Sequence, residues 1–313
     1  MSGGIDLHLH LDGSITAEDA IYLAGKCGVA LPARNACELR KYMTAPKCCA
    51  DLKEYLRSFE IPLLVLQTPE NVAYAIRSLV KRLAESGMRY AEIRFAPGLL
   101  TAGGASQREI AEAACVAFEA AEEEFRFSGG LIFCAMRAGA LSDEENRETA
   151  RTAAEFLGKG VVGIDLAGDE AKDFPSDHAK VFAMAREAGV PITVHAGEAG
   201  GADKIRDALA LGALRIGHGV RCVEDDSLVA ELAERGITLE TCYTSNLNTG
   251  ACTEKTFPLR ALMRAGVKVT LNTDNMTVSD TDLDKEYARL GITEEEKSVL
   301  LDNAEKAAFA AGL

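Results

Sequence analysis

The sequence predicts an α/β fold of the TIM (β/α)8 barrel type, and three observations support this prediction. Eight short apolar runs recur along the 313 residues, segments of helical period separate them, and polar residues gather where the runs end. The runs are nearly continuous in valine, isoleucine and leucine, as strands buried on both faces of a parallel sheet are. Eight strand–helix units fit this length, and such a barrel carries its active site at the carboxyl ends of the strands.

The eight predicted strands follow one another closely after a long first interval. They lie at 5–9, 89–95, 131–137, 161–166, 191–195, 214–218, 237–242 and 267–272. Glycine stands just before the second, fifth, seventh and eighth strands, at Gly87, Gly189, Gly236 and Gly266. Glycine ends helices in this way because it adopts the left-handed conformation without steric cost. A helix is therefore expected before each of these four strands.

Other signals mark helices more directly. Residues 107–125 carry their apolar side chains on one helical stripe and most of their glutamates off it. Pro258 is suited to open the helix before the eighth strand. Thr293 and Glu296 have the spacing of a capping box, so the last helix is expected to begin at Thr293.

The interval between the first two strands, residues 11–88, is too long for one strand–helix connection. It contains apolar residues at mixed helical spacing and several prolines, which predict a group of extra helices. These helices either fold over the barrel mouth as a lid or decorate the barrel away from the site. Their attachment to the first strand favours the lid. We expect residues 1–313 to form one domain that includes this insert.

Composition argues against several classes of protein. A net charge of −14 repels phosphate backbones, so no nucleic-acid partner is expected. No stretch approaches the ~20 apolar residues of a membrane span, and the first residues lack a basic-then-apolar signal. The nine cysteines are odd in number and form no CxxC pair, which favours free thiols in a reducing cytoplasm. We expect a cytoplasmic enzyme with no membrane contact and no obligatory protein partner.

Four of the five histidines stand at the ends of predicted strands. His8 and His10 end the first strand, His195 the fifth and His218 the sixth, and Asp274 follows the eighth. The spacing of two puts the rings of His8 and His10 on one face of a strand. Such a pair can bind one ion or simply face solvent. The further histidine and carboxylate at equivalent strand ends favour the ion, because both are common metal ligands.

Six segments together resemble the adenosine deaminases of the amidohydrolase superfamily. They are HLHLDGS (8–14), DLAGDE (165–170), TVHAGE (193–198), RIGHGV (215–220), CYTSNLNTGA (242–251) and LNTDN (271–275). They occur in the family order at similar separations, and the resemblance runs from the first strand to the last helix. Residues 51–64 also resemble the lid helices of that family.

The resemblance implies one Zn²⁺ per chain, with a water completing its coordination. Its four implied ligands are His8, His10, His195 and Asp274. Two-metal members of the superfamily carry a lysine at the end of the fourth strand, and this chain has none there. Zinc lowers the pKa of its water toward 7. By the same resemblance, Glu198 holds a proton for purine N1, while His218 and Asp274 orient the water and take its proton.

The resemblance also implies which residues bind a purine nucleoside. His10 would contact the substrate as well as the metal, and the Gly168 N–H would reach purine N3, where the missing Cβ permits close approach. Asp12 would accept a hydrogen bond from a ribose hydroxyl, although Asp-Gly is also an ordinary turn pair. Many members carry aspartate where this chain has Asn275, whose amide can donate to N7 without a protonated acid. The fifth histidine, His178, matches no motif and is expected at the surface.

The function predicted in this way is zinc-dependent hydrolytic deamination of adenosine, and of 2′-deoxyadenosine, to inosine or deoxyinosine and ammonia. Another 6-aminopurine substrate stays open, such as adenine, S-adenosylhomocysteine or a futalosine-type nucleoside, and Asp12 argues against free adenine. A non-catalytic barrel that binds purine or metal is a further alternative. It would not need Glu198 and His218 beside a complete ligand set.

Overall fold

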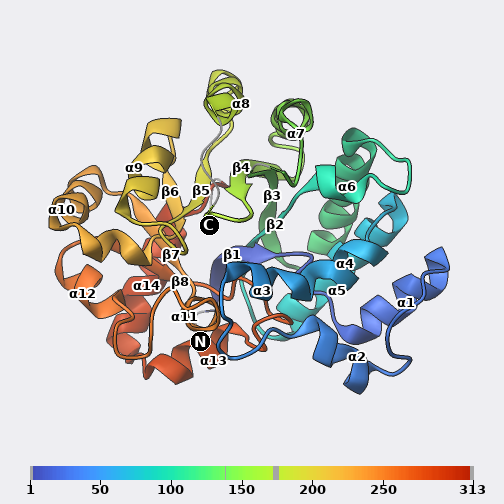
Figure 1. The fold of residues 1–313 in the computed structure, drawn as a ribbon, viewed down its shortest axis with the longest axis horizontal. Helices are drawn as coiled ribbons and strands as arrows, with labels where there is room; N and C mark the ends of the chain where they lie inside the picture. The colour runs from blue at the N-terminus through green and yellow to red at the C-terminus, as the bar shows by residue number, and fades with distance from the viewer. Residues whose placement is uncertain (1–2, 138, 172–175, 311–313) are drawn as a thin grey trace.

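The computed structural model describes residues 3–137, 139–171 and 176–310, and its architecture is α/β (Figure 1). Within these residues, eight parallel strands form two four-stranded sheets, each in chain order. They correspond one for one to the eight predicted runs, so the strand prediction is confirmed. The strands are β1 (Ile5–His10), β2 (Tyr90–Phe95), β3 (Ser128–Met136), β4 (Val161–Ala167), β5 (Thr193–Ala196), β6 (Arg215–His218), β7 (Thr238–Thr241) and β8 (Lys268–Leu271).

Single backbone bridges join the two sheets at both junctions. Between β8 and β1, His10 N donates to Asp274 O at 2.7 Å and Asp274 N donates to His8 O at 2.8 Å. Between β4 and β5, Ile164 N donates to Pro191 O at 2.9 Å. The predicted (β/α)8 barrel is therefore present as two four-stranded arcs of parallel strands that isolated bridges join.

β3 begins at Ser128, before the predicted start at residue 131. Its first residues include Gly129 and Gly130, a pair that suggests a turn in the sequence. In the sheet, a Cβ on Gly129 would lie 2.1 Å from Ala91 O, and one on Gly130 would lie 2.4 Å from Val162. The two glycines therefore permit a close approach of neighbouring strands, which the sequence pattern cannot reveal.

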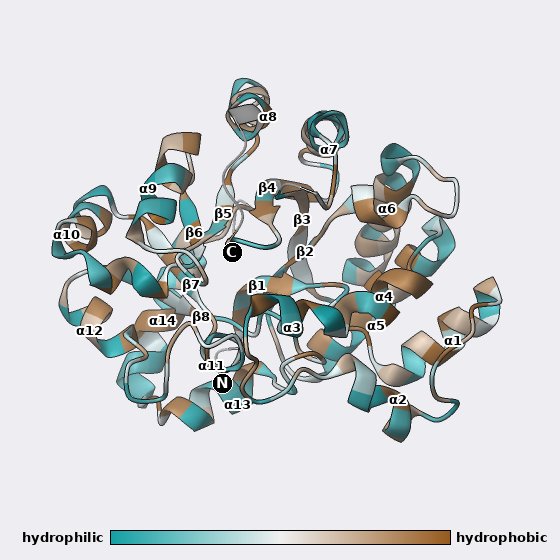
Figure 2. Ribbon diagram, in the orientation of Figure 1, coloured by the Kyte–Doolittle hydropathy of each residue, from teal (hydrophilic) through white to brown (hydrophobic). Residues whose placement is uncertain are grey.

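Helices surround the strands (Figure 1), and the outer ones, such as α7 and α10, carry both hydrophilic and hydrophobic residues (Figure 2). This is expected of helices that bury one face. The α-helices are α1 (Ala17–Cys27), α2 (Ala36–Met43), α3 (Leu52–Leu56), α4 (Glu60–Val65), α5 (Pro69–Glu85), α6 (Gln107–Phe125), α7 (Asp143–Phe156), α8 (Ser176–Glu187), α9 (Ala202–Leu211), α10 (Asp226–Arg235), α11 (Tyr243–Asn248), α12 (Leu259–Arg264), α13 (Leu283–Leu290) and α14 (Glu294–Ala307). Short 3-10 helices are η1 (Arg57–Phe59), η2 (Pro97–Leu100) and η3 (Val220–Glu224).

The predicted helix ends agree with the structure. α6 spans the predicted residues 107–125, and α12 begins directly after Pro258. Thr293 caps α14, and both hydrogen bonds of its capping box with Glu296 are present. All four predicted helix-ending glycines have positive φ: Gly87, Gly189, Gly236 and Gly266.

The insert between β1 and β2 forms α1 to α5 with η1. The helices of the insert lie in different surroundings. α1 lies at the edge of the molecule (Figure 1), whereas α2 and α3 contact the loop after β8: Arg40 of α2 donates to Asp280, and Asn275 donates to Tyr55 of α3. Only part of the insert therefore reaches the carboxyl ends of the strands.

The main apolar cluster contains buried residues from Leu9 in β1 to Leu300 in α14. It fills the space between the strands and the surrounding helices, and so holds the strand ends in fixed relative positions. Among the described residues, no helix has both the length and the apolar composition needed to cross a membrane.

Candidate active site

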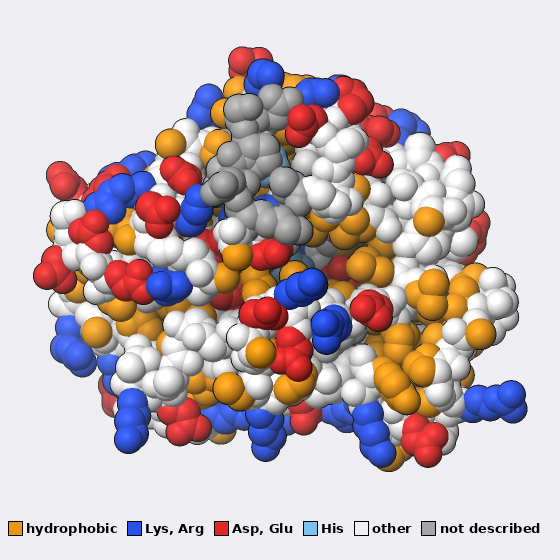
Figure 3. Space-filling view, viewed as in Figure 1, with side chains coloured by type: hydrophobic (Ala, Val, Ile, Leu, Met, Phe, Trp, Pro, Cys, Tyr) orange, Lys and Arg blue, Asp and Glu red, His pale blue; other side chains and the backbone are white. Residues whose placement is uncertain are grey.

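Eight of the nine residues singled out in the sequence line one cavity of about 310 Å³ at the carboxyl ends of the strands. This volume is in the range of small-molecule sites. Figure 3 shows histidine atoms near the middle of this face, with hydrophobic side chains around them. The eight residues are His10, Asp12, Gly168, His195, Glu198, His218, Asp274 and Asn275. The ninth, His8, is fully buried and lies beside them, its ring centroid 5.4 Å from that of His10.

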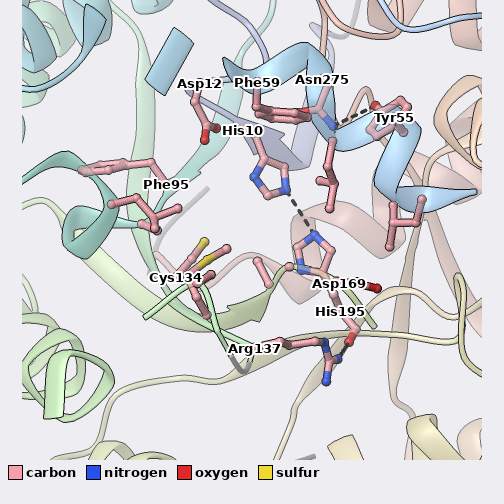
Figure 4. Close-up of a pocket in the computed structure, with 18 of the residues that line it drawn as sticks. His10, Asp12, Tyr55, Phe59, Phe95, Cys134, Arg137, Asp169, His195 and Asn275 are labelled. Atoms are coloured by element: carbon pink, nitrogen blue, oxygen red, sulfur yellow. Dashed lines mark hydrogen bonds between the residues drawn. The ribbon is translucent and has the colours of Figure 1, made fainter. Parts of the chain in front are cut away.

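The four predicted metal ligands meet at one point. Their ligand atoms all lie within 4.8 Å of one another. His10 Nε2 and His195 Nε2 are 3.1 Å apart (Figure 4), and Asp274 Oδ1 is 3.4 Å from Nε2 of both His8 and His10. His8 Nε2 is buried without a hydrogen-bond partner among the described residues. Converging imidazole nitrogens and a carboxylate with an unsatisfied buried nitrogen fit a divalent cation, so these residues form a candidate metal site.

Asp274 is ionised in this site. Burial by itself raises its pKa, but other contacts, led by the hydrogen bond and charge of His8, outweigh burial and hold the pKa of Asp274 below its usual range. Its other oxygen accepts a hydrogen bond from Ser245 Oγ at 2.5 Å. A charged carboxylate can bind a cation without first losing a proton.

Two site residues have a strained backbone. Asp274 has φ 59° and His218 has φ 62°, in the left-handed region that residues other than glycine rarely adopt. Such conformations cost of order 1–3 kcal/mol and persist where the surrounding structure imposes them. For Asp274, the hydrogen bonds that join it to β1 impose the conformation and turn its carboxylate toward the histidines.

Buried acids hold the outer nitrogens of two ligands. His8 Nδ1 is 2.8 Å from Glu240 Oε2, and His195 Nδ1 is 2.8 Å from Asp165 Oδ2. Arg94 lies between the acids and donates to Asp165 at 3.0 Å and to Glu240 at 2.8 Å. Acceptors of this kind fix the tautomer of a ligand histidine, so that its other nitrogen faces the metal.

These supporting residues were not predicted from the sequence. Burial alone raises the pKa of Glu240, but Arg94 and Arg215 outweigh burial and hold it well below its usual range. A single charged side chain inside an otherwise uncharged strand, as Glu240 is in ITLETC, was the available signal. The sequence alone does not say which histidine such a residue contacts.

Glu198 lies in the loop after β5 and is buried beside His218. Its Oε2 is 3.6 Å from His218 Nε2, and its Oε1 accepts a hydrogen bond from Thr249 at 3.0 Å. Burial, followed by the charges of Asp274 and Glu170, raises the pKa of Glu198 to about 8. The side chain therefore keeps its proton at neutral pH and can act as an acid.

The carboxylate of Glu170 holds the loop that carries Glu198. It accepts hydrogen bonds from four consecutive backbone N–H groups: Gly197 at 2.5 Å, Glu198 at 2.9 Å, Ala199 at 2.7 Å and Gly200 at 2.9 Å. Glu170 ends the DLAGDE segment after β4, yet no role was predicted for it. Its contacts cannot be inferred from that segment, because all four donors belong to a different loop.

His218 is a neutral imidazole in this site. Burial lowers its pKa well below the usual range; Asp274 opposes this shift, and the neighbouring His8 and His195 add to it. Asn246 Nδ2 lies 3.0 Å from His218 Nδ1; with the amide in this orientation, Nδ1 accepts and the proton is on Nε2. That Nε2–H points toward the cavity side occupied by Glu198.

The wall of the cavity opposite the strand ends comes from the insert. Phe59 and Tyr55 lie over His10 and Asn275 (Figure 4), and Leu52, Leu56 and Leu63 also line the cavity. Asp12 accepts from Gly13 N at 3.1 Å, and burial raises its pKa to about 6. Gly168 has φ 101°, and a Cβ there would meet Met136 at 3.3 Å.

The prediction that His178 lies at the surface is wrong. His178 is 1% exposed, and its Nε2 lies 3.2 Å from the carbonyl oxygen of Met136 at the end of β3. It belongs to α8, on the face that packs against the strands. One histidine in a helix of weak amphipathic pattern does not reveal which way it faces.

The fold and the site define an enzyme of the amidohydrolase type, with a candidate metal site at the carboxyl ends of parallel strands. The chain belongs to the adenosine deaminase family, whose model matches residues 4–312. It is 43% identical over 316 residues to an adenosine deaminase of Haemophilus ducreyi, covering 98% of this chain and 92% of the relative. An adenosine deaminase of Clostridium botulinum is 39% identical over 315 residues, with 98% and 92% covered.

Solved structures of related deaminases have the same fold. An adenine deaminase of Arthrobacter aurescens superposes with a TM-score of 0.88 at 29% identity, covering 98% of this chain and 94% of the other. An N6-mAMP deaminase of Arabidopsis superposes with a TM-score of 0.84 at 27% identity, covering 98% and 93%. The chain is therefore a TIM-type hydrolytic deaminase, and its reaction is the deamination of adenosine.

Proposed function

We propose that the chain deaminates adenosine and 2′-deoxyadenosine with one zinc ion, at the site formed by His8, His10, His195 and Asp274. The observation that carries the proposal is the meeting of these ligand atoms beside the protonated Glu198 in one cavity. When bound there, zinc would lower the pKa of a water toward 7 and so supply a nucleophile at neutral pH.

Glu198 is proposed as the acid that protonates purine N1. Attack at C6 removes the aromaticity of the ring and moves an electron pair onto N1. A proton bound at N1 stabilises this pair. The raised pKa of Glu198, about 8, supports this role because the proton is present before the reaction. The four hydrogen bonds of Glu170 keep the loop, and thus the acid, in place.

His218 and Asp274 are proposed to handle the nucleophile. With its proton on Nε2, His218 donates to the attacking oxygen and orients it. Asp274, ionised and adjacent, accepts the proton that the nucleophile loses and passes it to the amino nitrogen, so that the C6–N6 bond breaks and ammonia leaves. This division follows from the Asn246 contact, which leaves His218 without a free acceptor nitrogen.

The cavity residues away from the candidate metal site are proposed to determine which substrate binds. The Gly168 N–H binds N3, the Asn275 amide binds N7, and Asp12 accepts from a ribose hydroxyl. Relatives differ in their substrates, since the neighbouring structures include an adenine deaminase and an N6-mAMP deaminase of Arabidopsis. Asp12 and Asp169 line this cavity and disfavour an anionic 5′ group.

We further propose that α3, η1 and α4 form the lid within the insert 11–88. Five residues of this segment line the cavity, and their side chains are mainly apolar. A lid of this kind excludes water from the reacting ring.

All nine cysteines are free, which supports a reducing compartment such as the cytoplasm.

The test is the loss of the adenine absorbance band for a panel of 6-aminopurines, with metal content measured on the same sample. We expect stoichiometric zinc, efficient use of adenosine and 2′-deoxyadenosine, and poor use of adenine and AMP. Asp12→Ala should impair adenosine turnover and change the use of adenine little. Faster turnover of adenine than of adenosine by the unaltered protein would refute the nucleoside assignment.

The ligand set has a separate test. His8→Ala should lose zinc and activity together, because one of the four ligands is removed while the cavity lining is kept. Stoichiometric zinc in the purified variant would show that the ligand set is different.

A further inference from the structure

Tyr55 connects the insert to the residue proposed to bind purine N7 (Figure 4). Its side chain is buried in an apolar cluster that also contains Val278, from the loop after β8. Its hydroxyl group nevertheless has three polar neighbours. Asn275 Nδ2 donates to it at 3.0 Å, while Ser279 Oγ lies at 2.8 Å and Ser245 Oγ at 3.4 Å.

The available protons determine how Asn275 is oriented. Ser245 has one hydroxyl proton and donates it to Asp274. We assign the proton of Tyr55 to Ser279 Oγ, which lies 2.8 Å from the tyrosine oxygen. The tyrosine oxygen is then an acceptor, so it binds the NH₂ group of Asn275 and not the carbonyl. Burial, followed by the charge of Asp274, raises the pKa of Tyr55 well above its usual range, and the hydroxyl keeps its proton.

The surroundings of Asn275 disfavour the flipped orientation of its amide, in which Oδ1 and Nδ2 exchange places. Its Oδ1 has no hydrogen-bond partner among the described residues and lies against Gly13, where a Cβ would come within 1.8 Å. Purine N7 only accepts hydrogen bonds, so an amide that presented its oxygen to N7 would repel it. With one N–H bonded to Tyr55, the second N–H remains as a donor for the substrate.

We propose that Tyr55 is a positioning residue that fixes the Asn275 amide as a donor to purine N7, so that the insert takes part in choosing the purine. This role of Tyr55 rests on the role proposed above for Asn275. It predicts that the tyrosine hydroxyl affects the preference for substrates with N7, beyond any general effect on the fold.

The experiment compares kcat/KM for adenosine and for 7-deazaadenosine, which has C–H in place of N7. The variants are Tyr55→Phe, Asn275→Ala and the double variant, with Tyr42→Phe as a control. Tyr42 belongs to the same insert and is 55% exposed, so its variant should keep the preference of the unaltered protein. Ser279→Ala tests the same role independently, because it removes the acceptor of the Tyr55 proton and leaves the tyrosine side chain unchanged.

We expect the unaltered protein to prefer adenosine and Asn275→Ala to lose that preference. Tyr55→Phe should reduce the preference about three- to tenfold, the size of one neutral hydrogen bond. Ser279→Ala should reduce it in the same direction. The double variant should be no worse than Asn275→Ala, because the two residues act through one contact.

Three results would overturn the role of Tyr55. If Asn275→Ala loses the preference but Tyr55→Phe and Ser279→Ala keep it, Tyr55 does not position the amide while Asn275 still binds N7. If Asn275→Ala itself keeps the preference, the N7 contact is refuted and the role of Tyr55 with it. An equal fall in both substrates for Tyr55→Phe would indicate a structural role only.

Discussion

At the scale of single residues, burial changes what an ordinary side chain can do. Glu198 and Asp274 are both carboxylic acids in one cavity, yet burial raises the pKa of the first to about 8 while histidines lower that of the second. One therefore holds a proton while the other is ionised at the same pH. Pairs of acids with opposite shifts are a common arrangement for acid–base catalysis.

Replacing Glu198 by glutamine should abolish most turnover without affecting the metal site. Glutamine has nearly the same shape but cannot give a proton to N1, and groups of this kind contribute ~10²–10⁴-fold to rate. We expect a fall of this size in kcat with unchanged zinc content and thermal midpoint. A variant that keeps more than a third of the activity would contradict the assignment.

The raised pKa of Glu198 also predicts how stability depends on pH. Between the ordinary value of 4.5 and about 8, the folded protein holds a proton that the unfolded chain has released. The free energy of unfolding therefore falls as pH rises through this window, by on the order of 1 kcal/mol for each pH step of one. Glu198→Gln removes this dependence.

Urea unfolding of metal-free protein at pH 5 and pH 9 measures the effect. We subtract the unfolding free energy of the unaltered protein from that of Glu198→Gln at each pH. This difference should be larger, in favour of the variant, at pH 9 than at pH 5. An equal difference at both pH values would mean that the carboxyl titrates normally.

At the scale of elements, loops from different strands hold one another in place. The loop after β4 supplies Glu170, and the loop after β5 supplies the four N–H groups that donate to it. The position of Glu198, the proposed acid, is therefore fixed by contacts with a neighbouring loop.

Glu170→Gln should lower kcat/KM for adenosine by about tenfold or more, with zinc retained. An amide in this place turns an NH₂ group toward backbone donors, which leaves donors facing each other in a buried site. The matched control is Glu187→Gln on the exposed side of α8, which should behave as the unaltered protein. An unchanged kcat/KM in Glu170→Gln would show that the loop keeps its shape without this carboxylate.

At the scale of the whole molecule, a network of buried charges runs through the inside of the strands. Phe309 covers Arg215, with the guanidinium 3.6 Å from the ring centroid, and Arg215 donates to Glu240 at 2.6 Å. Glu240 in turn contacts His8 and Arg94. The last described residues of the chain are thus connected to a candidate metal ligand in β1.

Arg94→Met should destabilise the protein strongly. The change leaves the two buried acids Asp165 and Glu240 without the cation between them, and breaking such a buried pair costs about 3–5 kcal/mol. We expect a lower unfolding free energy in urea and weaker zinc retention, since both acids hold ligand histidines. Arg77→Gln, which breaks the exposed pair with Glu124, is the control and should change little. Equal effects of the two variants would contradict the structural role of the network.

Local patterns in the sequence determined much of this protein. The eight strands, the glycine-terminated helices and the capping box at Thr293 depend on neighbouring residues only, so they could be predicted. Eight of the residues predicted for the site also line one cavity, because parallel strands end on the same side of a sheet. The early start of β3 and the burial of His178 could not be predicted, since each depends on what packs against it.

Only the tertiary structure decided how these residues support one another. Glu240 meets His8 although 232 residues separate them, and Asn275 meets Tyr55 across 220 residues. The sequence placed the ligands in one site because parallel strands end on the same side of a sheet. Which buried acid holds which histidine depends on register, side-chain direction and exclusion of water, and these are fixed only when the strands and the insert pack together.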